Sequence, residues 1–330
     1  MTAGAFPGVR LHVVSGKGGT GKTTVAAALA IALASGPGRR ALLVEVEGRQ
    51  GIAQLFDTPP LPYEERRVAG APGGGEVLAL AIDPEEALLE YLEMFYNLRR
   101  AGKTLKRLGA VDFATTIAPG MRDVLLTGKV MEATRRKKPD GSPVYDAVVM
   151  DGPPTGRITR FLNVNSEVAG LARVGPIKGQ ANAVMSLIGS AETAVHLVTI
   201  LEEMPVQETA DGVRELLGAG LPLGAVVVNM VRDPLLPADD LVAARAGALD
   251  PVALTEGMRL AGLEPDARLV GTLLAEATDH ADRVELEESG RERLRALERP
   301  TYELPLLADA VDTGALLALA ALLREQGLTA

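Results

Sequence analysis

Short apolar runs separated by segments with helical periodicity extend along most of the chain. The runs are rich in valine, leucine, isoleucine and alanine, as is typical of buried strands, and they lie at residues 9–14, 41–46, 77–82, 144–150, 194–200, 225–228 and 301–307. Between the first two runs, residues 25–34 strongly favour a helix, which we expect to start at Thr24. Strands that alternate with helices predict an α/β fold in which helices flank a mostly parallel central sheet.

Two regions are predicted to be helical insertions, at about residues 84–138 and 157–192. In the first, Asp83 caps a helix and Pro84 fits its first turn, and apolar residues then recur at spacings of three and four up to Gly109: Ala87, Tyr91, Met94, Leu98, Ala101, Leu105 and Leu108. A further helix of this insertion presents Met121, Val124, Leu125 and Met131 on one face. The second insertion offers Leu171, Val174, Val184, Leu187 and Ile188 to another helical packing surface.

The remaining segments are predicted from their turn residues and charges. Residues 57–75 contain many prolines and glycines and are expected to form a loop. Residues 267–298 have alternating charges and favour one long or broken helix with a solvated face. A chain of 330 residues is compatible with a single domain spanning 1–330 that carries both insertions.

Composition and charge exclude several functions. The 34 basic and 43 acidic side chains give a net charge of −9, and aromatic residues make up 3%, so neither a broad electrostatic surface for nucleic acid nor base stacking is expected. The absence of cysteine excludes disulfides, cysteine-based zinc sites and a thiolate site for a soft metalloid. The three histidines, His12, His196 and His280, are widely spaced and are interpreted as ordinary strand or helix residues.

Nothing in the sequence predicts membrane insertion. The N-terminus lacks a basic segment followed by an apolar core, and the apolar stretch 304–323 contains two aspartates and a proline. We therefore expect a cytoplasmic protein that is not an integral membrane protein.

The clearest chemical motif is the glycine-rich stretch Ser15–Thr24, SGKGGTGKTT, between the first strand and the first helix. It fits the phosphate-binding pattern G-x-x-x-x-G-K-[ST] through Gly16, Gly21, Lys22 and Thr23. Glycines allow successive backbone N–H groups to face one anion, Lys22 supplies charge for the β- and γ-phosphates, and the Thr23 hydroxyl binds Mg²⁺. The sequence thus predicts ATP and Mg²⁺ as cofactors, bound by residues Gly16, Lys17, Gly18, Gly19, Thr20, Gly21, Lys22, Thr23 and Thr24.

Carboxylates at strand ends are expected beside this loop. Glu45 and Glu47 close the strand 41–46, and Asp151 follows the strand 144–150. Ligands of open parallel sheets bind beyond the carboxyl ends of the strands, so both glutamates are expected near the phosphates. Asp151 is placed to support Mg²⁺, and the Gly152 N–H to contact the γ-phosphate.

The motif K-G-G-x-G-K-T-T resembles the deviant Walker A sequence of the ATPase class that includes ArsA, MinD and ParA. This resemblance implies that Lys17 reaches across a dimer to the partner's nucleotide and that Glu47 orients the attacking water, although the class usually has aspartate there and proline at the position of Gly48. The stretch DGPPTGRITRFL resembles the D-x-x-P-T-G-H-x-x-R-x-L switch of the ArsA-like branch, with Arg157 in place of histidine. The branch also implies that Asn229 and Pro305 lie near the adenine.

The resemblance implies an ATP-hydrolysing, dimer-forming switch in which Lys17, Lys22, Glu47 and Asp151 are catalytic. Its helical insertion would engage a hydrophobic client or a membrane partner. The apolar stripe formed by Leu88, Leu92, Phe95 and Tyr96 could serve a client or simply be core. Two alternatives stay open: a weakly or non-catalytic nucleotide-gated scaffold paired with a homologous ATPase, and the energising subunit of an anion transporter that does not use cysteine-bound arsenite. The dimer could be a homodimer or a heterodimer.

Overall fold

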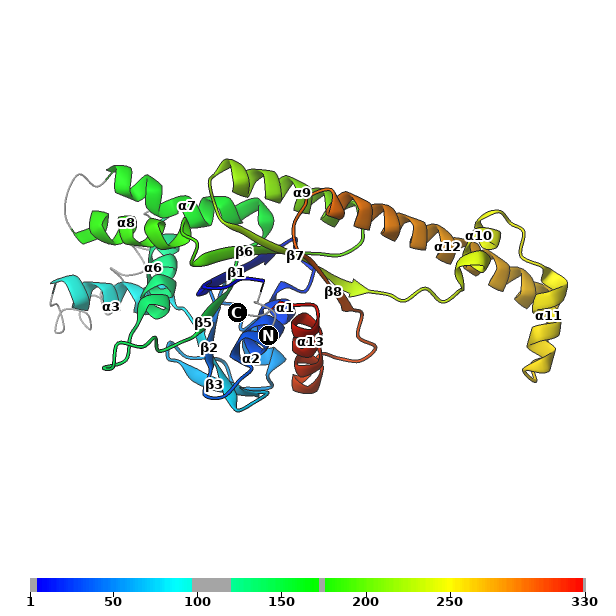
Figure 1. Cartoon of the computed structure of the whole chain (residues 1–330), viewed down its shortest axis with the longest axis horizontal. Helices are drawn as coiled ribbons and strands as arrows, with labels where there is room; N and C mark the ends of the chain where they lie inside the picture. The colour runs from blue at the N-terminus through cyan, green and yellow to red at the C-terminus, as the bar shows by residue number, and fades with distance from the viewer. Residues whose placement is uncertain (1–4, 97–119, 172–175, 329–330) are drawn as a thin grey trace.

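The computed structural model describes residues 5–96, 120–171 and 176–328, and its centre is an eight-stranded sheet (Figure 1). The strand order is β3-β4-β2-β5-β1-β6-β7-β8, and every neighbouring pair is parallel except β3 and β4. The strands are β1 Leu11–Gly16, β2 Arg40–Glu45, β3 Arg66–Ala71, β4 Gly75–Ala81, β5 Ala147–Asp151, β6 Thr193–Thr199, β7 Leu223–Val231 and β8 Thr301–Pro305. The predicted α/β class with a mostly parallel sheet is confirmed.

Helices cover both faces of this sheet because successive strand residues point to opposite sides. On one face, α1 (Lys22–Ala34), α2 (Gly51–Leu55) and α13 (Thr313–Glu325) pack over strand residues such as Leu43 and Val149. On the other, α6 (Met121–Arg135), α7 (Thr155–Leu171) and α8 (Pro176–Ile188) pack over alternate residues such as Leu42 and Met150. The alternation leaves the central strands buried on both sides.

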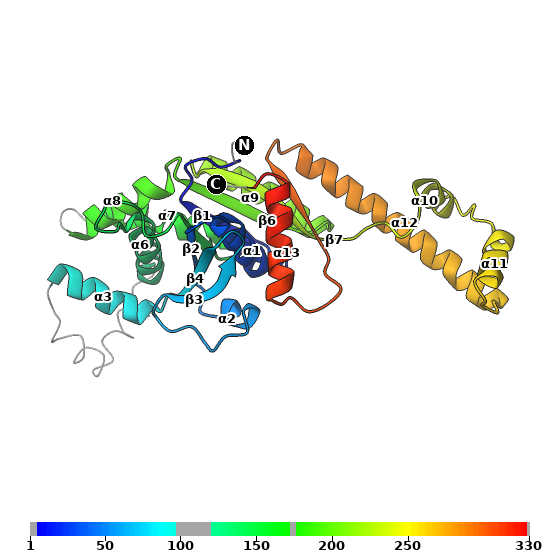
Figure 2. The same ribbon diagram turned by 60° about the horizontal axis from the view of Figure 1, so that its bottom comes forward.

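Three helices form an arm that extends away from the sheet in both views (Figures 1 and 2). They are α10 (Ala238–Arg245), α11 (Pro251–Leu260) and α12 (Ala267–Arg295). The base of α12 packs Leu294 against Val206 of α9 (Glu203–Gly218) and against β7. Farther out, the Thr278 hydroxyl of α12 donates to the Ala244 carbonyl of α10 at 3.1 Å, which ties the two helices together.

Several element boundaries differ from the sequence-based expectations. The predicted loop 57–75 is wrong in part, because β3 lies within it as an antiparallel edge strand whose arginines and glycine hide the usual apolar alternation. The helix α1 begins at Lys22, two residues before its predicted start. Helix α3 begins at Pro84, and Asp83 caps it through hydrogen bonds at 2.9 Å from two first-turn N–H groups. Beyond Tyr96, the predicted course of this helix lies outside the described residues.

Candidate functional site

The glycine-rich loop connects the end of β1 to the start of α1, and two of its glycines are required by positive φ angles and close contacts. Gly16 has φ +154°, and a Cβ there would lie 2.2 Å from the Val198 carbonyl oxygen of β6. Gly21 has φ +82°, and its Cβ would lie 2.3 Å from the Asn229 side-chain nitrogen. Any side chain at either position would therefore push the loop away from the strand ends that hold it.

The loop leads into a helix N-terminus that no described side chain caps. Gly21 is the N-cap residue of α1, and no side-chain hydrogen bond reaches the N–H groups of the first turn. Thr20 and Lys22 turn inward instead, since both donate to the Lys17 carbonyl, at 2.9 and 3.3 Å. Free N–H groups with the positive end of the helix dipole form an anion site, and the glycine loop leaves space for phosphate beside them.

The side chains of Thr23, in the first turn of α1, and Asp151, at the end of β5, meet at the carboxyl ends of the adjacent strands β1 and β5. The Thr23 hydroxyl donates to Asp151 Oδ2 at 2.7 Å, because β5 pairs with β1 and places Asp151 opposite Val14. The other oxygen, Oδ1, is buried without a hydrogen-bond partner among the described residues. Burial raises the pKa of Asp151 to about 6, and the nearby Thr23 and Lys22 oppose that rise. A buried orphan carboxylate oxygen beside a threonine hydroxyl is a suitable ligand set for Mg²⁺.

The two glutamates at the end of β2 have different surroundings. Glu45 is buried, and its carboxylate accepts hydrogen bonds from the backbone N–H groups of Gln50 at 2.5 Å and Ile52 at 3.2 Å. It therefore fixes the start of α2, and it also lies opposite Asp151 in the β2–β5 pair, where its charge raises the pKa of Asp151. Glu47 lies 3.5 Å from Arg49 and 3.6 Å from Arg157, measured between charged atoms.

Burial lowers the pKa of Lys22, while the charges of Asp151 and Glu47 oppose that change. These interactions place the Lys22 amine, Asp151 and Glu47 around one end of the loop. The sequence motifs did not predict Arg49 as a partner of Glu47, and they marked Arg157 only as a departure from the switch motif.

Lys17 is paired within its own chain. Its amine lies 2.9 Å from Glu208 of α9, and both side chains are about one-third exposed. A separation of 191 positions along the chain hid this pair from sequence reasoning. The expected reach of Lys17 to a second subunit stays a prediction.

Asn229 and Pro305 lie near the ends of the adjacent strands β7 and β8. The Asn229 amide donates to the Thr20 carbonyl at 3.0 Å, so this residue holds the phosphate-binding loop in place. Pro305 is exposed at the neighbouring strand end. The two residues are placed on the same side of the loop, and their contact with an adenine stays a prediction.

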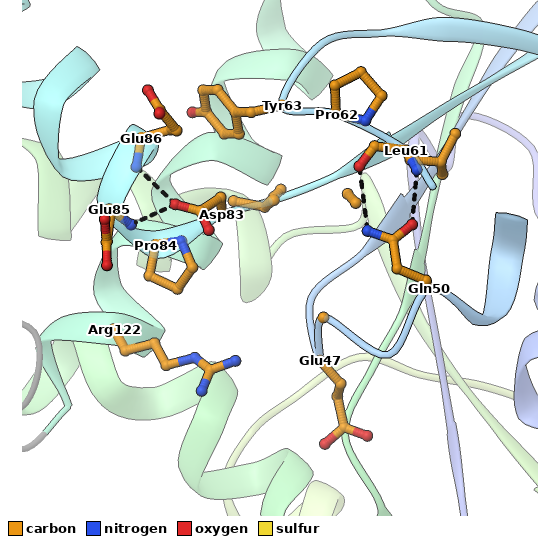
Figure 3. Close-up of a pocket in the computed structure, with 13 residues that line it drawn as sticks. Glu47, Gln50, Leu61, Pro62, Tyr63, Asp83, Pro84, Glu85, Glu86 and Arg122 are labelled. Atoms are coloured by element: carbon orange, nitrogen blue, oxygen red, sulfur yellow. Dashed lines mark hydrogen bonds between the residues drawn. The ribbon is translucent and has the colours of Figure 1, made fainter. Parts of the chain in front are cut away.

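A pocket of about 970 Å³ opens beside Glu47 (Figure 3). Tyr63, the start of α3 and Arg122 of α6 line it, together with acidic residues Asp83, Glu85 and Glu86. Gln50 fixes one wall by hydrogen bonds to both backbone groups of Leu61, at 2.7 and 3.2 Å. The pocket thus lies between the segment that follows β2 and the helices α3 and α6.

The parallel sheet, the glycine loop before an uncapped helix, and the Thr23–Asp151 pair together define the fold and site of a P-loop ATPase. The model of the anion-transporting ATPase family, ArsA_ATPase, matches residues 9–189. The chain belongs to this family. Its described part contains no helix long and apolar enough to cross a membrane.

Proteins with several different names are similar to this chain in sequence. The ATPase BagA of Mycobacterium tuberculosis is 54% identical over 322 residues, which cover 97% of this chain and 94% of that protein. The arsenical pump-driving ATPase of Escherichia coli is 28% identical, covering 76% of this chain and 45% of its own length. The ATPase GET3 of Kluyveromyces lactis is 27% identical, covering 66% of this chain and 71% of its own length.

Proposed function

We propose that this chain hydrolyses ATP to ADP and phosphate and uses the reaction as a conformational switch. The observation that carries the proposal is the Thr23–Asp151 hydrogen bond with a buried, unpartnered Asp151 oxygen, directly beside the uncapped start of α1. Thr23 and Asp151 would hold Mg²⁺, which when bound would neutralise charge developing on the phosphates. The backbone N–H groups from Gly16 to Thr24 and the Lys22 amine would bind the phosphates.

Glu47 is the best candidate to orient the attacking water. It follows β2, the strand next to β5, and its negative charge acts on the Lys22 amine. Its side chain is 19% exposed and therefore partly accessible to solvent. Its pairing with Arg49 and Arg157 also supports the second candidate, a scaffold in which hydrolysis is slow, because a carboxylate held by two guanidinium groups is restrained from turning toward a water. Steady-state turnover of ATP well above the background rate would contradict the scaffold.

The switch would act through a dimer and through the helices beside the nucleotide site. Lys17 would exchange its partner Glu208 for the nucleotide of a second subunit, either a copy of this chain or a homologous ATPase. The helices α3 and α6 would engage a hydrophobic client or a membrane complex. Leu88 of α3 packs partly buried against the core, while the side chains of Leu92, Phe95 and Tyr96 lie outside the described set. An anion-transport partner is the other family-based possibility, without cysteine-bound arsenite.

The catalytic proposal is tested with single substitutions and a fluorescent ATP analogue. We expect Lys22→Ala to abolish nucleotide binding, because it removes the charge at the phosphates. Lys17→Ala should leave binding largely intact and remove hydrolysis, and Asp151→Asn should lower the Mg²⁺-dependent rate by about two orders of magnitude or more. Lys138→Ala, which removes an exposed lysine from a distant turn, is the matched control. Equal hydrolysis by the wild type and Lys17→Ala would contradict the role of Lys17 across a dimer.

The client is tested by recovering Glu47→Gln protein from its own cells in the presence of ATP and Mg²⁺. Mass spectrometry would then identify the bound proteins. Recovery of membrane proteins with apolar tails would support a client-carrying ATPase. Recovery of a homologous ATPase chain alone, or of a membrane complex, would place this chain as the switch within a larger assembly.

A further inference from the structure

Arg157 has a backbone held by hydrogen bonds and an exposed side chain. The loop before it is fixed to β1, since the Ser15 hydroxyl donates to the Pro153 carbonyl at 2.7 Å. The Gly152 N–H, which was expected to contact the γ-phosphate, donates instead to the Val14 carbonyl at 2.8 Å. The Arg157 N–H in turn donates to the Pro154 carbonyl at 2.8 Å at the start of α7. Its side chain is 62% exposed, so the guanidinium can change partners without moving the helix.

Two carboxylates face this guanidinium from different elements. Glu47, after β2, lies 3.6 Å away, and Arg49 holds the other oxygen of Glu47 at 3.5 Å. Because Glu47 has this second partner, departure of Arg157 would not leave it without a positive neighbour. The second carboxylate is Asp123 in the first turn of α6.

Arg157, Glu47 and Asp123 line a common cavity of about 200 Å³. Asp123 is partly buried, and burial raises its pKa. Three guanidinium groups oppose that rise, and the one of Arg157 has the strongest effect, ahead of Arg122 and Arg160. Asp123 is thus partly desolvated, and of the nearby guanidinium groups that of Arg157 stabilises its charge most. Asp123 and Glu47 are therefore competitors for one cation.

We propose that Arg157 is a positioning residue that exchanges between Glu47 and Asp123, and thereby couples the hydrolytic carboxylate to helix α6. When Glu47 turns to the attacking water, Arg157 moves to Asp123 and holds the first turn of α6. Helix α6 packs against α3, α7 and α8, so a change at its start reaches the whole helical layer beside the site. The proposal rests on the function proposed above for Glu47, and it names the element that senses the state of that residue.

The exchange is tested first in the nucleotide-free, full-length protein by amide hydrogen exchange of Val124 to Gly128 in α6. We expect Glu47→Gln to slow exchange there by about two- to five-fold, the range for partly exposed ion pairs, because Arg157 then pairs with Asp123 alone. The slowing should disappear when Arg157→Gln or Asp123→Asn is added. It should persist in the matched control Arg160→Gln, which removes the same charge one turn farther along α7. Equal slowing with and without Arg157 would overturn the proposal.

A second measurement uses a non-hydrolysable ATP analogue and ADP. Asp123→Asn should leave Arg157 on Glu47 and weaken the analogue about two- to five-fold relative to ADP, and this effect should be absent in the Arg157→Gln background. An unchanged ratio in Asp123→Asn, or the same change in both backgrounds, would also count against the exchange. A wild-type protein that binds no nucleotide would refute the proposed function, whereas the exchange of Arg157 would still be decided by the amide measurement.

Discussion

His12 of β1 and His196 of β6 form a buried pair whose protonation states follow from its hydrogen bonds. The Ala225 N–H donates to His196 Nδ1 at 3.1 Å, so the proton of a neutral His196 is on Nε2. That nitrogen lies 3.0 Å from His12 Nδ1, which must therefore accept. A proton added to either ring would place two donors against each other. Burial lowers the pKa of His12 to about 4 and lowers the pKa of His196 well below its ordinary value.

This pair predicts a loss of stability in acid. The unfolded chain binds a proton near pH 6.5 and the folded chain only near pH 4, so the free energy of unfolding decreases as the pH falls through this window. The His12 contribution is about 3 kcal/mol. In urea titrations at several pH values, His12→Gln, which can still accept from His196, should lose less stability over the same window. Identical pH dependence of the two proteins would contradict the prediction.

The Lys17–Glu208 pair is expected to oppose assembly of the active site and so to lower the ATPase rate. If Lys17 must leave Glu208 to serve a second subunit, Glu208→Gln should raise the ATPase rate at low protein concentration by about two- to five-fold, as expected for one exposed ion pair. The measurement is the rate as a function of protein concentration. Glu203→Gln, on the same helix, is the control. A lower rate in Glu208→Gln would show instead that Glu208 supports the active arrangement.

At the scale of elements, α12 is a helix that buries one face near its base and exposes another. It spans 29 residues, or about 43 Å, and the hydrophobic cluster at its base contains the fully buried Leu294. Two turns earlier, Leu286 is 70% exposed. The sequence correctly predicted a long helix over 267–298, but the charge pattern alone could not show where packing against the body of the protein begins.

These two faces should respond differently to the same substitution. Leu294→Ala should lower the free energy of unfolding by about 2–5 kcal/mol, because it leaves a cavity between α9, α12 and β7. Leu286→Ala should change it by less than about 0.5 kcal/mol. Chemical denaturation measures both values. A large decrease in the free energy of unfolding for Leu286→Ala would mean that this part of the arm is covered in solution.

At the scale of the whole molecule, the proposed nucleotide site lies at the carboxyl end of the central strand β1, with the helical layer α6 to α8 on one face of the sheet and the arm farther away (Figure 1). We expect Glu47→Gln with ATP and Mg²⁺ to accumulate as a dimer, because the proposed switch closes on ATP and this variant does not release it by hydrolysis. Light scattering coupled to size-exclusion chromatography should show the doubled mass. The double variant Lys22→Ala/Glu47→Gln should stay monomeric under the same conditions, and a dimer in that control would separate assembly from nucleotide binding.

The sequence by itself determined those parts of the protein that depend on local pattern. The apolar runs identified the buried strands, the glycine spacing identified the phosphate-binding loop, and Asp83 marked the start of α3, because each depends on a few adjacent residues. It did not reveal β3, since an edge strand needs no continuous apolar run. The parallel sheet was predictable because strands that alternate with helices have few other arrangements.

Only the tertiary structure decided which distant side chains meet. It brought Thr23 to Asp151, Lys17 to Glu208, His12 to His196, and Arg157 to Glu47. It also separated Glu45, which holds backbone N–H groups, from Glu47, which lies among arginines. Such contacts depend on strand order and on how helices pack across the sheet, and this arrangement is set by the burial of the whole core.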